Sequence, residues 1–103
     1  MRVDQKTFSR RLSELRVQKG VSARDMSLSL GQSAGYINNI ENGVNFPSMS
    51  VFFYICDYLE ITPKDFFDLE ASNPSKQNEL QKVFAKLSQT QIDHLIALAK
   101  DLK

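Results

Sequence analysis

The chain has 103 residues, of which 42% are hydrophobic and 24% are charged, and its net charge at pH 7 is +1. This length suits one small domain with a short appendage, and the single cysteine excludes an internal disulfide framework. No stretch approaches the roughly 18 apolar residues of a membrane span, and the N-terminal segment lacks the apolar core of a secretion signal. We therefore expect a cytoplasmic protein without membrane contacts.

The first predicted element is a helix over residues 5–19, with Asp4 as its N-cap. One face carries apolar residues at helical spacing, namely Phe8, Leu12 and Leu15. Three basic residues lie outside that face and should be solvated: Arg10, Arg11 and Lys19. The helix is thus expected to pack one stripe against the rest of the molecule.

Residues 21–43 predict two short helices joined by a tight turn. Ser22 can cap the first helix, Asp25 completes a capping-box pattern, and Gly31 supplies the permissive backbone where the helix stops. Ser33 is the expected cap of the second helix. Helices this short bury little surface alone, so they are useful only when other helices brace them and present them outward, as in a helix-turn-helix.

Two more helices are predicted downstream. One begins after Ser48, and its apolar stripe consists of Met49, Phe52, Phe53, Cys56 and Leu59. Thr62 caps the next, and at least one of Phe66 and Phe67 should fill the core. Cys56 is expected to be a buried, unreactive thiol.

Residues 71–75 read as a linker, followed by two amphipathic helices that we expect to form a helical hairpin. The second starts with a capping box formed by Ser88 and Gln91. Neither helix can bury its apolar face on its own. The two helices should therefore pack on the rest of the chain, on another protein or, as we expect, on a second copy in a homodimer. The predicted packing or dimer residues are Leu80, Phe84, Leu87, Ile92, Leu95 and Ile96.

The order of these elements resembles the lambda-repressor-like (Cro/XRE) helix-turn-helix domains. Residues at the family's helix-turn-helix positions are Val21, Ser22, Met26, Ser27, Leu30, Gly31, Ser33, Tyr36, Ile37, Ile40, Glu41 and Gly43. The resemblance extends over about residues 5–68. It implies an all-α fold in which residues 1–70 form a five-helix DNA-binding domain and residues 71–103 add a linker and two helices.

The resemblance also implies which residues meet double-stranded DNA. The base-facing positions of the second helix of the motif are Ala34, Gly35, Tyr36, Asn38 and Asn39. An asparagine can pair bidentately with adenine, so Asn38 and Asn39 are the expected readers. The alternative is that both asparagines belong to a merely solvated helix face.

Phosphate contacts are expected at the N-termini of the second and fourth predicted helices and in the loop beyond the third, and Arg10, Arg11 or Lys19 could add further charge. The candidates are Ser22, Ala23, Arg24, Ser33, Asn42, Asn45 and Ser48. Charge is unevenly distributed, with net charges of +5 over residues 1–24, −6 over 25–71 and +2 over 72–103. A basic face can therefore exist despite a nearly neutral total. The resemblance further implies a structural ion pair between Arg16 and Glu41.

These observations predict a sequence-specific transcriptional regulator, a repressor-like homodimer that reads a short palindrome. The alternative is a protein-interaction module that retains the fold with weak or no operator binding, because no Lys or Arg lies between Arg24 and Lys64. The sequence has no metal-ligand cluster, phosphate-binding glycine loop or nucleophile with a base, so we expect no enzyme activity, cofactor, metal or small-molecule ligand.

Overall fold

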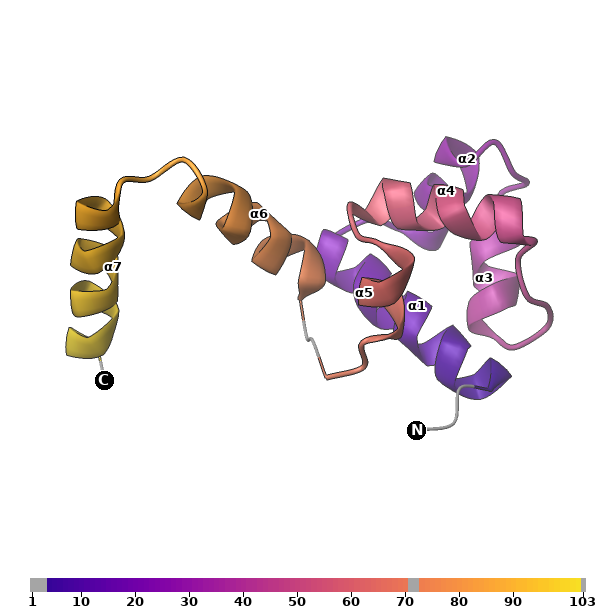
Figure 1. Ribbon diagram of the computed structural model, residues 1–103. Helices are drawn as coiled ribbons and strands as arrows, with labels where there is room; N and C mark the ends of the chain where they lie inside the picture. Colours follow the sequence, from indigo (N-terminus) through magenta and orange to yellow (C-terminus); the bar gives the residue numbers. More distant parts are fainter. Residues whose placement is uncertain (1–3, 71–72, 103) are drawn as a thin grey trace.

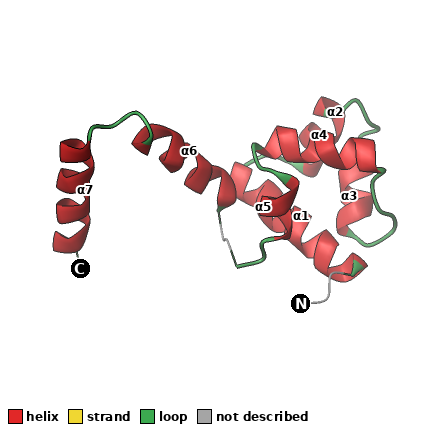
Figure 2. Cartoon of the chain, viewed as in Figure 1, coloured by secondary structure: helices red, strands yellow, loops and turns green. Residues whose placement is uncertain are grey.

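The computed structural model describes residues 4–70 and 73–102, and within them the chain forms seven helices and no strand (Figures 1 and 2). The helices are α1 (Gln5–Lys19), α2 (Ala23–Ser29), α3 (Tyr36–Glu41), α4 (Met49–Leu59), α5 (Pro63–Phe67), α6 (Pro74–Phe84) and α7 (Gln89–Asp101). The predicted all-α class is confirmed. None of these helices has the length and apolar character that crossing a bilayer requires.

Local capping signals set most helix boundaries. The Asp4 side chain accepts a hydrogen bond from the Thr7 amide at 2.9 Å, and α1 ends at Gly20, whose φ of 80° is left-handed. Thr62 at the start of α5 and Ser88 at the start of α7 both form complete capping boxes. Each of these contacts spans three residues or fewer, which explains why the sequence alone predicted them.

The helices α1 to α5 enclose one hydrophobic core. Its buried members are Phe8, Leu12, Leu15, Met26, Ile37, Ile40, Phe52, Ile55, Cys56, Leu59, Ile61 and Phe66. The Phe66 ring lies at the centre, with ring centroids 4.9 Å from Phe8 and 5.2 Å from Phe52. Burying a phenylalanine stabilises a fold by about 1.5–3 kcal/mol, so this aromatic cluster is a large part of what holds α1, α4 and α5 together.

The stripe predicted for α4 is partly wrong. Phe52, Cys56 and Leu59 are buried, but Met49 and Phe53 remain exposed, and Ile55 takes a core position instead. The helix buries the 52, 55, 56, 59 face, which is the i, i+3, i+4, i+7 spacing of one helical side. Met49 lies one turn earlier, beyond the part of α4 that the core covers.

The prediction that Arg11 is solvated is also wrong, since only 3% of this residue is exposed. Its Nε donates to the Phe66 carbonyl at 2.7 Å, and its Nη2 donates to the carbonyls of Asp65 and Asp68 at 2.9 Å each. The last carbonyls of a helix have no partner within the helix. Arg11 therefore supplies donors to the C-terminal end of α5 from across the bundle.

The last two helices extend away from the bundle, and the molecule measures 50 × 29 × 22 Å (Figure 1). The expected hairpin is not formed, because α7 turns away after residue 88 and does not lie alongside α6. Their apolar side chains stay exposed as a result, including Leu80, Phe84, Leu95 and Ile96, whereas Leu87 and Ile92 are half-buried. One contact to the bundle is a hydrogen bond from the Asn78 amide to the Asp65 carboxylate at 3.0 Å.

Candidate nucleic-acid interface

The helix-turn-helix unit consists of α2, a turn over residues 30–35 and α3. Ser22 caps α2 by accepting from the Asp25 amide at 3.0 Å, and Gly31 has a φ of 74° where the chain leaves the helix. Ser33 does not cap α3, contrary to expectation. The helix begins later, at Tyr36, and its N-cap is Gly35, which has no side chain to offer. The Ser33 carbonyl accepts from the Tyr36 amide instead, within the turn.

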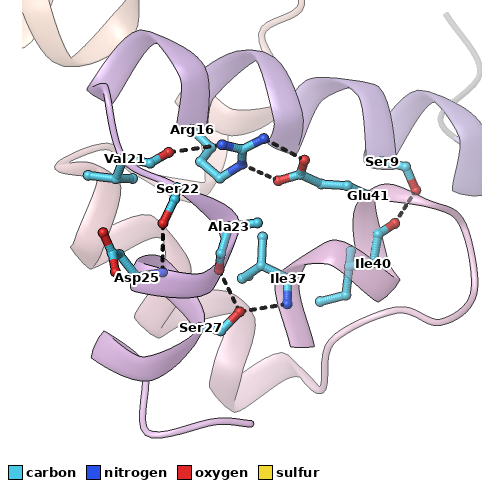
Figure 3. A network of polar contacts seen from close by, with 10 residues as sticks. All are labelled: Ser9, Arg16, Val21, Ser22, Ala23, Asp25, Ser27, Ile37, Ile40 and Glu41. Carbon is cyan, nitrogen blue, oxygen red and sulfur yellow. Dashed lines mark hydrogen bonds and ion pairs between the residues drawn. The ribbon is translucent and has the colours of Figure 1, made fainter. Parts of the chain in front are cut away.

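The missing cap is replaced from another helix. Ser27 of α2 is fully buried, and its Oγ accepts a hydrogen bond from the Ile37 amide at 2.9 Å (Figure 3). The same hydroxyl donates to the Ala23 carbonyl at 2.7 Å. The first amides of a helix need acceptors, and a hydroxyl at this place satisfies one of them. Ser27 therefore fixes the start of α3 against α2.

The end of α3 is held by an ion pair with α1, so the expected pair of Arg16 and Glu41 is present. Arg16 Nε lies 2.6 Å from Glu41 Oε2 and its Nη2 lies 2.9 Å from Oε1, a bidentate arrangement (Figure 3). The third guanidinium nitrogen donates to the Val21 carbonyl at 2.9 Å. The hydrogen bond with Glu41 raises the pKa of Arg16 despite the opposing effect of burial.

A second contact holds the same end of α3, and the sequence did not single it out. Ser9 of α1 is buried, and its Oγ donates to the Ile40 carbonyl at 2.6 Å (Figure 3). The sequence pattern assigns no role to Ser9 and marks Ser27 only as a motif position without a role, because a serine on a helix is usually solvated and only its tertiary neighbour reveals the bond. With Arg16, they attach both ends of α3 to the bundle.

The predicted base-facing residues differ in their exposure to solvent. Ile37 and Ile40 point into the core, so the intervening Asn38 and Asn39 are exposed, as is Gly35. Ala34 and Tyr36 are half-buried, and burial raises the pKa of the Tyr36 hydroxyl. Asn38 and Asn39 are therefore the side chains best placed to reach a ligand from α3.

The predicted phosphate-contacting residues are mostly at the surface. Those that are exposed are Ser22, Arg24, Ser33, Asn42, Asn45 and Ser48, whereas Ala23 is half-buried and packs against the core. The Ser22 and Ser48 hydroxyls already accept bonds from their own helices, from the amides of Asp25 and Val51. These two hydroxyls can still donate to an anion, because each retains its proton.

Other reactive groups lie away from this surface. Cys56 is buried in the core, where burial, with smaller effects of Asp57 and Asp65, raises its thiol pKa to about 11. His94 is exposed on α7. In the part of the chain that the structure describes, no three His, Cys, Asp or Glu side chains gather where they could hold a metal ion.

Comparison with known proteins supports the same geometry. Residues 9–72 match the model of a helix-turn-helix domain family, which leaves α6 and α7 outside the matched segment. Among solved structures, the chain is similar to the restriction-modification controller protein C.AhdI from Aeromonas hydrophila. The TM-score is 0.58 at 30% sequence identity, covering 62% of this chain and 93% of that one. No curated protein matches the chain.

Proposed function

The chain belongs to the Cro/XRE-like helix-turn-helix family of DNA-binding transcription regulators, and from that premise we propose that it reads a short palindrome as a repressor-like homodimer. In this proposal residues 1–70 bind DNA with α3 in the major groove, and residues 71–103 join two copies. We also propose a cytoplasmic location and a regulatory rather than an enzymatic role. The similarity to a controller protein supports regulation.

The observation that carries the proposal is the combination of a clamped α3 with two exposed amide side chains. Ser27 and the Arg16–Glu41 pair hold the two ends of the helix, while Asn38 and Asn39 face solvent. Holding both ends of α3 fixes the backbone from which the two amides can form bidentate pairs with adenine. Each good asparagine–adenine pair would contribute about 1–3 kcal/mol of discrimination.

The exposed faces of α6 and α7 support the homodimer. Phe84 of α6 and the α7 residues Ile92, Leu95, Ile96 and Ala99 line an apolar hollow of about 320 Å³. A monomer would leave these side chains in water, whereas a second copy could cover them. Regulators with this motif bind two half-sites one helical turn apart as two-fold dimers, so such a contact fits the proposed palindrome.

Selection of bound duplexes from a random DNA pool tests this function. We expect the native protein to enrich one palindromic sequence, and the double variant N38A/N39A to lose that selectivity while keeping weak binding to all duplexes. The control is Q77A/Q81A, which removes two exposed amides from α6 and should enrich the same sequence as the native protein. If N38A/N39A enriches the same sequence as the native protein, Asn38 and Asn39 are not the residues that recognise the bases.

A protein-interaction module is the second candidate. It is favoured by the exposed apolar side chains of α6 and α7 and by the absence of Lys and Arg between residues 24 and 64 of the sequence. The same experiment separates the two. If the native protein and N38A/N39A bind every duplex equally weakly, the interaction module replaces the regulator.

A further inference from the structure

Apart from Lys19, which pairs with Glu60 at 3.4 Å, the basic side chains of α1 divide into two groups. Arg11 and Arg16 are turned inward and donate to protein carbonyl and carboxylate oxygens. Lys6 and Arg10, one helical turn apart, are exposed. Because no Lys or Arg lies between residues 24 and 64, positive charge for α3 and the loop after it must come from elsewhere in the chain. Arg24 of α2 is one such source, and the exposed pair on α1, which lies beside the end of α3, is a second.

Lys6 and Arg10 line an open hollow of about 690 Å³ between the first half of α1 and the end of α3. Ser13 of α1 lies in the same wall, and Asn42 and Gly43 form the opposite one. Asn42 was predicted to contact phosphate from its position alone. The hollow therefore places two cations beside a residue that already belongs to the proposed DNA surface.

The acidic groups of this hollow are engaged in the protein. Asp4 accepts from the Thr7 amide and hydroxyl at the start of α1, and Glu41 is paired with Arg16. Arg10 makes an exposed ion pair with Glu14 at 3.9 Å. Exposed pairs of this kind contribute about 0–1 kcal/mol, so the Arg10 guanidinium can leave Glu14 for a stronger anion at little cost.

We propose that Lys6 and Arg10 bind the phosphate backbone of DNA, extending the contact surface from the α3–α4 loop onto the N-terminal half of α1. The proposal rests on the function given above. An ammonium and a guanidinium at one-turn spacing suit a polyanion with regularly spaced charges, and Arg10 can bind a phosphate bidentately. Such contacts supply affinity and register but carry no sequence information.

The salt dependence of DNA binding tests this inference. The variant K6A/R10A is compared with K82A/K86A, which removes the same charge from exposed positions in and after α6. Affinities are measured between 50 and 200 mM salt on the selected duplex and on a random duplex. Each phosphate contact adds about 0.9 to the slope of log affinity against log salt concentration. Two contacts per protomer therefore predict that, over this fourfold range of salt, the affinity of the native protein falls about 12-fold more per protomer than that of K6A/R10A.

We expect K6A/R10A to bind both duplexes more weakly by the same factor at low salt, with a shallower slope, and K82A/K86A to follow the native protein. Equal slopes for the two variants would overturn the role of Lys6 and Arg10 while leaving the regulator intact, since the native protein would still select its sequence. A native protein that binds neither duplex would overturn both the regulator and this surface. Circular dichroism verifies that each variant is folded.

Discussion

The hydroxyl of Ser27 accepts a hydrogen bond from the Ile37 amide at 2.9 Å, and so a side chain of α2 performs the capping that α3 lacks. The residue at the N-cap of α3 is Gly35, which has no side chain to accept a hydrogen bond from the first amides of this helix. The bond lies between two fully buried residues. The orientation of the proposed reading helix therefore depends on a tertiary contact.

Replacing Ser27 with alanine should leave the Ile37 amide buried without a partner. We expect S27A to lower the free energy of unfolding by about 1–2 kcal/mol, the usual cost of an unsatisfied buried donor. Native-state hydrogen exchange of the Ile37 amide measures the effect directly and should accelerate in S27A. The exposed Ser29 on the same helix provides the control S29A, which should exchange like the native protein. An Ile37 amide that stays protected in S27A would contradict the capping role.

Replacing Arg11 with methionine should destabilise the bundle. The side chain keeps its apolar length but loses the donors to the carbonyls of Asp65 and Phe66 at the end of α5. We expect the free energy of unfolding in urea to fall by about 2–4 kcal/mol, because the buried Phe66 carbonyl and the part-buried Asp65 and Asp68 carbonyls lose a charged donor at once. The neighbouring variant R10M alters an exposed residue and should change stability by less than about 0.5 kcal/mol. Equal stabilities would refute the bridging role of Arg11.

The contact between α6 and the bundle should be visible in an acid titration. The hydrogen bond from Asn78, followed by bonds from Thr62, lowers the pKa of Asp65 below its ordinary 3.8. A carboxylate with a lowered pKa stabilises the fold above pH 3.8, and this contribution is lost as the pH falls through the folded-state value. We expect N78A to raise the pKa of Asp65, measured by NMR of the carboxyl carbon. The control Q81A should leave it unchanged.

The thiol of Cys56 should resist alkylation in the folded protein. Its pKa of about 11 and its burial leave almost no accessible thiolate at pH 8. We expect iodoacetamide to react with the native protein at a rate set by unfolding. In about 8 M urea, which unfolds most small domains, it should react at the rate of an ordinary thiol. Rapid modification of the native state would show that the core around Cys56 opens without global unfolding.

The proposed homodimer should depend on the apolar face of α7. The variant L95D/I96D places two charges on that face, and we expect it to be a monomer by light scattering at micromolar concentration. The variant T90D/A97D adds the same charge to exposed positions outside the predicted apolar stripe and should retain the native mass. A dimeric L95D/I96D would exclude this face as the dimer contact, and a monomeric native protein would exclude the homodimer itself.

Most helix boundaries were predictable because the information lies within three or four residues. Asp4, Thr62 and Ser88 accept from amides three positions later, and Gly20 ends α1 through its own left-handed backbone. The prediction for Ser33 failed on the same local reasoning, because α3 starts after Gly35 and takes its acceptor from α2. A side chain that is distant in sequence competes with a local cap only when packing brings it close.

Helical spacing, caps and the order of motif residues all act over one or two turns, so the all-α class could be predicted from the amino-acid sequence. Which polar side chains stabilise the fold and which stay exposed to bind a ligand became evident from the packing of the helices. Arg11 and Arg10 are adjacent in sequence, yet one is buried against α5 and the other faces the hollow beside α3. The side chains of adjacent helical residues point about 100° apart, and the packing of α1 against α5 determines which of the two is buried.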